Sequence, residues 1–276
     1  MKIDIIKKLV SKLPHLFVAV IIRNKECIVT HRLLKDRKIA LEYNMRFDLF
    51  NPDQLSLEAI NYINSLQMKY RFTYICYYLN RENQGALSGT NRDDFKKLNI
   101  DFSKMDKLLF DNRWCVYSST KDISYIKNYF KEVGIDFIYS PFILIEYLIK
   151  KEIKEGGMQL FLLYDKDSVA LSIYYGQKFL YSNFFKKSIN IGNPTSDKKV
   201  ELDDTIFEFL QISIHDFYEG SFFESSFIER VVFFDNYGVD LKLIDRVENE
   251  LFLPVDIREV SIANVMIELS KEEIIS

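Results

Sequence analysis

The sequence is poor in glycine, proline and cysteine, and it has no large excess of charge of either sign. Its 276 residues include only 9 glycines, 5 prolines and 3 cysteines, while 48% of them are hydrophobic and 28% are charged. This composition excludes collagen-like, disulfide-rich and disordered proteins. At about 150 residues per domain, the length predicts two lobes that can each bury a core.

The balance of charges indicates which partners to expect. The chain carries 37 lysines and arginines against 40 aspartates and glutamates, which gives a formal net charge of −3. Non-specific binding to DNA or RNA depends on a basic surface. We therefore expect no direct nucleic-acid partner.

Neither disulfide bonds nor a membrane-spanning helix is expected. Cys27, Cys76 and Cys115 lie far apart in apolar, strand-like runs, which is typical of buried free thiols in a reducing compartment. No run approaches the roughly 18 consecutive apolar residues that a membrane helix needs. Residues 5–13 have an amphipathic pattern that favours a packed terminal helix over a helix on a membrane surface or a partner. We expect a cytoplasmic protein.

The hydrophobic pattern predicts the same order of elements in both halves of the chain. The first half begins with three strands, a helix and a strand, over residues 15–23, 27–33, 38–47, 52–70 and 72–79. The second half begins in the same way, over residues 158–164, 169–175, 178–185, about 201–217 and 230–235. This repetition predicts a duplicated α/β protein with two mixed sheets flanked by helices.

Two stretches without strand or helix patterns complete the predicted organisation. A polar, glycine-containing loop is expected over residues 80–93. The glycine pair Gly156-Gly157 is the best candidate for a boundary. It divides the chain into an N-terminal lobe of residues 1–155 and a C-terminal lobe of residues 156–276.

Three stretches of the second half resemble a known family. Residues 159–173 contain a strand, the acidic turn at Asp165 and a returning strand, residues 230–238 contain a strand and a loop that ends at Gly238, and residues 248–255 contain a helix end and a strand. Together with the duplicated order, they resemble the actin-like family of the pilus-assembly protein PilM and the cytoplasmic domain of the type II secretion protein GspL. The resemblance implies a duplicated actin-like (RNase H-like) fold of two lobes with a nucleotide site.

The residues at the implied nucleotide site depart from the pattern of the family. An actin-like site uses glycine-rich turns, because backbone N–H groups must approach the phosphates closely. The turn at residues 23–26 has no glycine, the second turn has Asp167 and Ser168 where glycine is expected, and the third keeps only Gly238. Extra carboxylates beside a phosphate are unfavourable without a metal ion.

We therefore expect a vestigial nucleotide site with no catalytic residues. The resemblance assigns to it six residues, namely Asp165, Asp167, Ser168, Asp235, Asn236 and Gly238. We expect no bound cofactor, ATP with Mg²⁺ included, and no structural metal. A fold can be kept while its site is lost, so the chain is expected to be a pseudo-ATPase.

The resemblance also implies a role and a set of partners. Proteins of this family act in the inner-membrane platforms of type II secretion, type IV pilus and competence machines, the last of which take up DNA in transformation. The chain is expected to be a scaffold that links the assembly ATPase to a membrane-anchored platform protein by protein–protein interaction. It would then be cytoplasmic and peripheral to the inner membrane through its partners, and a homodimer is compatible with this role.

An active nucleotide-binding enzyme is the alternative. It would be an actin-like ATPase, a relative of sugar kinases or, with less support, a glycosyltransferase in which Asp165 and Asp167 form an Asp-x-Asp metal motif. Each of these enzymes would bind a nucleotide tightly together with a divalent ion. The scaffold would not, and this difference discriminates between the two classes.

Overall fold

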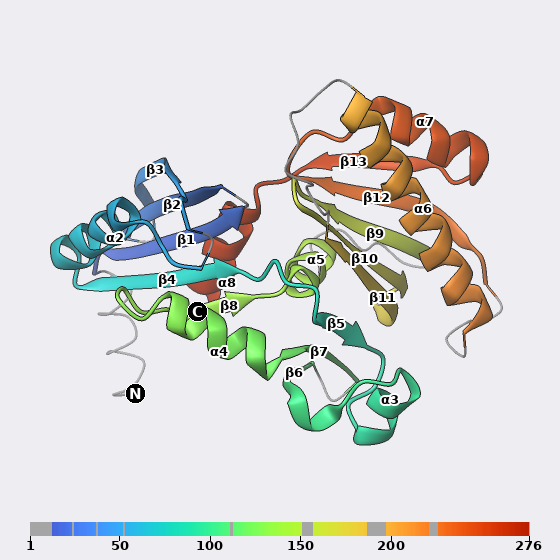
Figure 1. Cartoon of the computed structure of the whole chain (residues 1–276), viewed down its shortest axis with the longest axis horizontal. Coiled ribbons are helices and arrows are strands. Elements are labelled where there is room, and N and C mark those ends of the chain that lie inside the picture. The colour runs from blue at the N-terminus through green and yellow to red at the C-terminus, as the bar shows by residue number, and fades with distance from the viewer. Residues whose placement is uncertain are drawn as a thin grey trace. The chain divides into compact units, whose positions relative to one another are not determined.

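The computed structural model of the chain contains two five-stranded sheets, a smaller three-stranded sheet and the helices that pack on them (Figure 1). The structure describes residues 13–275 except 24, 37, 52, 111–112, 151–156, 187–196 and 221–225, and for residues 197–203 it describes the backbone alone. Residues 5–12 of the predicted N-terminal amphipathic helix lie outside the described residues. Contacts within the chain divide it into two compact units, which are described separately below.

The first unit is built on a five-stranded mixed sheet. Its strands are β1 (His15–Arg23), β2 (Glu26–Lys35), β3 (Lys38–Asp48), β4 (Phe72–Tyr78) and β8 (Phe137–Tyr139). They lie in the order β3-β2-β1-β4-β8, with β1, β2 and β3 antiparallel and β4 and β8 parallel to β1. The three strands predicted at the start of the chain are therefore confirmed as a meander.

Helices cover both faces of this sheet, and the alternation of side chains explains why. Leu16, Val18 and Val20 point to one face and belong to the same buried cluster as residues of α2 (Leu57–Lys69) and α4 (Thr120–Tyr129). The residues between them point to the other face, where α8 (Ile262–Ile275) packs on β1 and β4. Because both faces are covered, β1 is apolar along nearly its whole length.

The second unit contains a sheet with the same topology. Its strands are β9 (Met158–Tyr164), β10 (Ser168–Tyr175), β11 (Lys178–Lys186), β12 (Ile228–Asp235) and β13 (Val255–Glu259). They lie in the order β11-β10-β9-β12-β13, which matches the first sheet strand for strand. One face packs on α6 (Asp197–Glu219) and α7 (Leu241–Glu250), and β9 and β10 also contact α5 (Pro141–Lys150). The predicted duplication is confirmed.

A third, three-stranded sheet belongs to the second unit and replaces the predicted loop at residues 80–93. It consists of β5 (Gln84–Leu87), β6 (Met105–Phe110) and β7 (Trp114–Ser119), in the order β5-β7-β6. Between β5 and β6 lie the short helix α3 (Arg92–Lys97) and the 3₁₀ turn η1 (Phe102–Lys104). The loop prediction was wrong for residues 84–87, which form β5 by pairing with β7, and for residues 92–93, where α3 begins after its N-cap Asn91; residues 80–83 and 88–91 form neither helix nor strand.

The compact units do not follow the predicted boundary between residues 155 and 156. The first unit contains residues up to Leu79, 122–140 and 261–276, whereas residues 80–121 and 141–260 form the second. The physical reason is an exchange of helices. The helix α8 follows the second sheet in the chain but packs on the first, and α5 comes before the second sheet and packs on it.

The described ranges contain no helix that is both long and apolar enough to cross a membrane. The three cysteines are buried and unbonded, as the sequence predicts.

Burial raises the pKa of Cys27 and Cys76 to about 12 and that of Cys115 to about 11, above the ordinary value of 9.0. Above pH 9 the unfolded chain loses these protons while the native chain keeps them, so the free energy of unfolding falls as the pH rises, by up to about 1.4 kcal/mol per pH unit for each thiol. Urea unfolding at pH 8 and pH 10, with Cys27→Ala as the comparison, measures this slope. Native thiols that react with Ellman's reagent as fast as free cysteine at pH 8 would contradict it.

Candidate functional site

A tight acidic turn joins β9 to β10 in the second unit. The N–H of Asp165 donates to the carbonyl oxygen of Ser168 at 2.9 Å, which leaves only Lys166 and Asp167 at the tip. Asp165 is fully buried, and Asp167 and Ser168 are buried as well. The turn contains no glycine, and two of its four residues are buried aspartates.

The loop after β12 is organised around the carboxylate of Asp235. Its oxygens accept hydrogen bonds from the backbone N–H groups of Tyr237, Gly238 and Val239 at 2.9, 2.7 and 2.8 Å. Gly238 has a φ of +98°, a conformation that side chains disfavour, so glycine is needed there for the loop to close on the carboxylate. Three successive N–H groups are thus taken up by the chain's own aspartate.

The turn and the loop meet at one edge of the second sheet. The strands β9 and β12 are parallel neighbours, with Asp235 opposite Tyr164, so their carboxyl ends lie together. The Asn236 side chain donates through Nδ2 to Oδ1 of Asp165 at 2.7 Å, and its backbone N–H donates to the carbonyl oxygen of Tyr164 at 2.9 Å. The structure therefore places Asp165, Asp235 and Asn236 at one position, where α/β folds commonly bind ligands.

The electrostatic character of this edge is acidic. Asp165, Asp167 and Asp235 are all buried, and Lys166 lies at the tip of the turn with its Nζ 6.0 Å from the centre of the Tyr237 ring. Among the described residues, no three histidine, cysteine, aspartate or glutamate side chains gather closely enough to hold a metal ion. The Asp165-Lys166-Asp167 sequence therefore does not form part of such a cluster, and the edge has an excess of negative charge over positive.

The corresponding turn of the first sheet joins β1 to β2. Its flanking residues Arg23 and Glu26 form an ion pair at 3.6 Å, and the carbonyl oxygen of Lys25 accepts from the N–H of Leu49 at 2.8 Å. The turn has no glycine in its sequence and no aspartate that would position a metal ion. Both hairpin turns thus lack the glycine that lets backbone N–H groups approach a phosphate closely, and only the turn between β9 and β10 contains aspartate.

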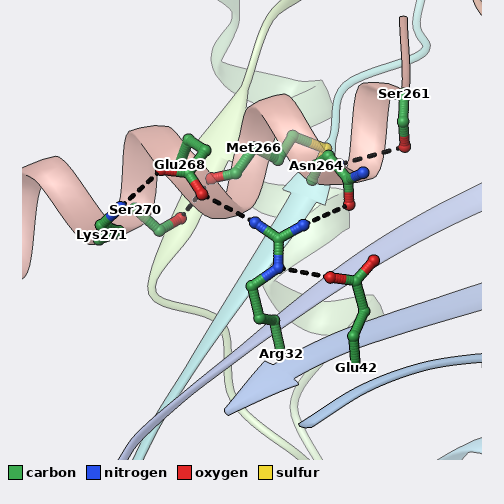
Figure 2. Close-up of polar contacts among 8 residues, drawn as sticks. All are labelled: Arg32, Glu42, Ser261, Asn264, Met266, Glu268, Ser270 and Lys271. Atoms are coloured by element: carbon green, nitrogen blue, oxygen red, sulfur yellow. Dashed lines mark hydrogen bonds and ion pairs between the residues drawn. The ribbon is translucent and has the colours of Figure 1, made fainter. Parts of the chain in front are cut away.

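A second polar cluster, which the sequence analysis did not identify, lies in the first unit (Figure 2). The guanidinium of Arg32 on β2 donates from Nε to Glu42 of β3 at 2.7 Å, from Nη1 to Glu268 of α8 at 2.7 Å and from Nη2 to Asn264 of α8 at 3.0 Å. Glu268 also pairs with Lys271 at 2.8 Å. The signal that could have revealed this cluster is Arg32, a charged residue within the apolar run of β2. A buried charge is strongly destabilising unless it is paired and hydrogen-bonded.

Two parts of the chain match families of domains whose function is unknown. Residues 13–146 match a domain of unknown function, DUF8569, and residues 193–275 match another, DUF8341. No curated protein matches the chain.

Solved structures with an actin-like fold match nearly the whole chain. A protein of unknown function with an actin-like ATPase fold from Bacteroides thetaiotaomicron is 9% identical, with a TM-score of 0.51 over 91% of this chain and 92% of that one. A chain of the PilM–PilN type IV pilus biogenesis complex is 10% identical, with a TM-score of 0.52 over 96% of both chains. A Ppx/GppA enzyme from Aquifex aeolicus is 12% identical, with a TM-score of 0.41 over 95% and 93%. The first two confirm the actin-like fold predicted from the sequence.

Proposed function

We propose that the chain is an actin-like scaffold of an inner-membrane platform that belongs to a type II secretion, type IV pilus or competence machine, and that it has no ATPase activity. The observation that carries the proposal is the loop around Asp235, whose three N–H groups already bind a carboxylate of the same chain. An actin-like ATPase needs such N–H groups for its nucleotide.

Charge argues in the same direction. A nucleotide phosphate placed about 4 Å from one buried carboxylate is repelled by about 4 kcal/mol per pair of unit charges at an effective dielectric constant of 20. Asp165, Asp167 and Asp235 all lie at this edge, so each carboxylate would repel the phosphates of a nucleotide that binds there without a divalent ion. A tightly bound nucleotide is therefore disfavoured at this site.

The fold supports the choice of partners. One of the similar structures is a chain of the PilM–PilN type IV pilus biogenesis complex. We propose that this chain likewise binds a membrane-anchored platform protein and the assembly ATPase of its machine. It would then be cytoplasmic and held at the inner membrane by these partners.

The test is a titration with ATP, GTP and UDP-sugars in the presence of Mg²⁺ or Mn²⁺, followed by calorimetry and thermal shift. A site with a Kd of about 10 μM would, at about 1 mM nucleotide, add about 2.7 kcal/mol of stability. For a chain of this size that raises the melting temperature by roughly 5 to 10 °C. We expect no saturable heat and a shift below about 1 °C, for the wild type and for Asp165→Ala alike.

Saturable binding that is lost in Asp165→Ala would overturn the proposal of a scaffold without a nucleotide and would point to a nucleotide-dependent enzyme. The positive arm of the test is co-expression with a pilus-type ATPase and a membrane-anchored protein encoded beside the gene. We expect a complex that survives gel filtration without nucleotide. Failure of every such pair to associate would contradict the proposed partners even if no nucleotide binds.

A further inference from the structure

The outer strand of the first sheet borders an apolar groove on the side of α2. The groove has a volume of about 300 Å³. Leu41, Tyr43 and Met45 of β3 form one wall, and α2 forms the other through side chains that include Tyr62 and Lys69. The groove and the free side of β3 are together called the β3 groove below.

The strand β3 is an edge strand with large apolar side chains at its surface. It pairs with β2 from Lys38 to Asp48, and in the part of the chain that the structure describes no strand lies on its other side (Figure 1). Tyr43 is 54% exposed and Met45 40%. A long open edge strand offers unpaired N–H and C=O groups to another chain, and proteins usually cover or blunt such edges.

The duplicated sheet shows what such cover looks like. The strand β11 holds the corresponding edge position, and Phe185 on it stacks against Phe209 of α6 with ring centres 5.4 Å apart. Ser182 on β11 exchanges two hydrogen bonds of 2.9 Å with the backbone of Ala86 on β5. The chain thus covers side chains of β11 with its own helix and strand, whereas the described residues leave most side chains of β3 exposed.

The charge around the β3 groove is positive at one end. Lys35 and Lys38 face each other at the turn from β2 to β3, with Asp36 and Arg37 between them in the sequence. Lys69, in the last turn of α2, lines the groove near the same end of the sheet. These residues carry more positive than negative charge, so they favour an acidic partner.

The floor of the groove is neutral. His31 lies there with its Nδ1 3.2 Å from the hydroxyl of Tyr62, so both polar groups have a partner. Burial, and then the charge of Lys69, lower the pKa of His31, which keeps its ring uncharged near neutral pH. The floor therefore supplies apolar surface and no charge for a bound group.

We infer that the β3 groove binds an extended acidic segment of a partner protein, which adds to β3 as a sixth strand of the first sheet. The backbone of the segment pairs with the free side of β3. Its alternate apolar side chains pack beside Tyr43 and Met45, and its carboxylates lie near Lys38 and Lys69. The inference goes beyond the proposed function, because it does not depend on whether the partner belongs to a secretion or pilus machine.

A second copy of the chain fits this surface less well. An antiparallel pair of β3 strands would bring the far end of one β3 to the basic end of the other. That far end carries Arg46 beside Asp48, so it offers no net negative charge. Complementary charge thus favours an acidic segment of another protein.

Selection from a random dodecapeptide library displayed on phage tests the inference on the full chain. We expect enriched sequences with apolar residues at alternate positions and acidic residues gathered toward the end that lies beside Lys38 and Lys69. Synthetic copies should bind with a Kd of about 10 to 100 μM. Tyr43→Lys should weaken this binding at least tenfold, and Lys69→Glu several-fold. Tyr175→Lys, which changes another half-exposed tyrosine on β10, should leave it unchanged.

Methylation of alternate backbone nitrogens separates strand addition from other modes of binding. Peptides methylated on the nitrogens that face β3 should lose binding, since they can no longer donate to the strand. Equal binding of methylated peptides, enriched sequences with helical spacing, or no enrichment that depends on Tyr43 would each overturn the inference. So would a dimer in gel filtration that Tyr43→Lys dissociates, because the occupant would then be a second copy. Failure of the nucleotide and partner tests above would leave these results unaffected.

Discussion

Replacing Arg32 with methionine will lower the free energy of unfolding by about 3 kcal/mol, because removal of one member of a buried ion pair leaves its partners without compensation. The Arg32 side chain is only 8% exposed and binds Glu42, Glu268 and Asn264 at once. Methionine keeps much of the volume, so the loss reports on the guanidinium. Urea unfolding measures the change, and hydrogen exchange should show that α8 loses protection.

The control for this prediction is Arg246→Met on α7. Arg246 also binds two carboxylates, those of Asp204 and Glu250, but its side chain is 34% exposed. Exposed ion pairs contribute about 0 to 1 kcal/mol, so this variant should lose less than about 1 kcal/mol. Equal losses at the two sites would refute the prediction that the buried Arg32 stabilises the fold more than the exposed Arg246 does.

The double variant Arg32→Met with Glu268→Gln refines the interpretation. If the cost of Arg32→Met comes from an uncompensated carboxylate, neutralising Glu268 should restore part of the lost stability. Arg32→Lys should be intermediate, because an ammonium group cannot donate in three fixed directions as the planar guanidinium does. This series separates charge from geometry in the docking of α8.

The strands could be predicted from sequence because both sheets are covered on two faces. Buried strands read as nearly continuous apolar runs, as in Leu16–Ile22 and Leu160–Tyr164. Eight of the ten strands of the two large sheets, β1 to β4 and β9 to β12, lie where the hydrophobic pattern predicted them. The order of strands in each sheet follows from the duplicated order along the chain, since β-β-β-α-β units pack in few ways.

The start of α2 was predicted less well, although the sequence carried a signal. The pattern placed it at Pro52, but the helix begins at Leu57 because Ser56 is its N-cap and accepts from the N–H of Ala59 at 3.3 Å. Serine before an acidic first turn, here Glu58, is the usual mark of such a start. Choosing the serine over the proline would have given the observed helix.

The third sheet and the composition of the two units could not be predicted in this way. The strand β5 has only four residues, and its pairing with β7 joins segments about 30 residues apart, so no local period marks it. The helices α5 and α8 are exchanged between the two sheets by long-range packing. Local propensity contains no information about which sheet a helix packs on. The predicted boundary near Gly156 therefore cut the sequence once, whereas each compact unit combines segments from both sides of that boundary or from separate parts of the chain.

The candidate site could be predicted from the sequence only in part. The resemblance placed Asp165, Asp235 and Asn236 in one site, and the structure brings them together through the hydrogen bond from Asn236 to Asp165. The sequence could not show that Asp235 turns inward to bind its own loop, since this depends on the backbone conformation that Gly238 permits. In this conformation the Asp235 carboxylate occupies the N–H groups of Tyr237, Gly238 and Val239.

Replacing Asp235 with alanine will therefore destabilise this loop by about 3 kcal/mol. Hydrogen bonds to a charged group contribute about 1.5 to 3 kcal/mol each in a buried setting, and water can replace part of the three that Asp235 accepts. Asp235→Asn keeps one acceptor oxygen and should lose about half as much. Hydrogen exchange of the amides of Tyr237, Gly238 and Val239 gives the local measurement, and urea unfolding the global one.

The matched control is Asp256→Ala on the neighbouring strand β13. Asp256 is about half exposed and pairs with Arg230 at 3.1 Å, so its loss should cost less than about 1 kcal/mol. If Asp235→Ala leaves the three amides as protected as before, other contacts hold the loop and the carboxylate does not. If protection is lost and ATP still does not bind, repulsion by Asp165 and Asp167 suffices to exclude it. Binding of ATP gained only in Asp235→Ala would instead show that this one carboxylate occupies the place of a phosphate.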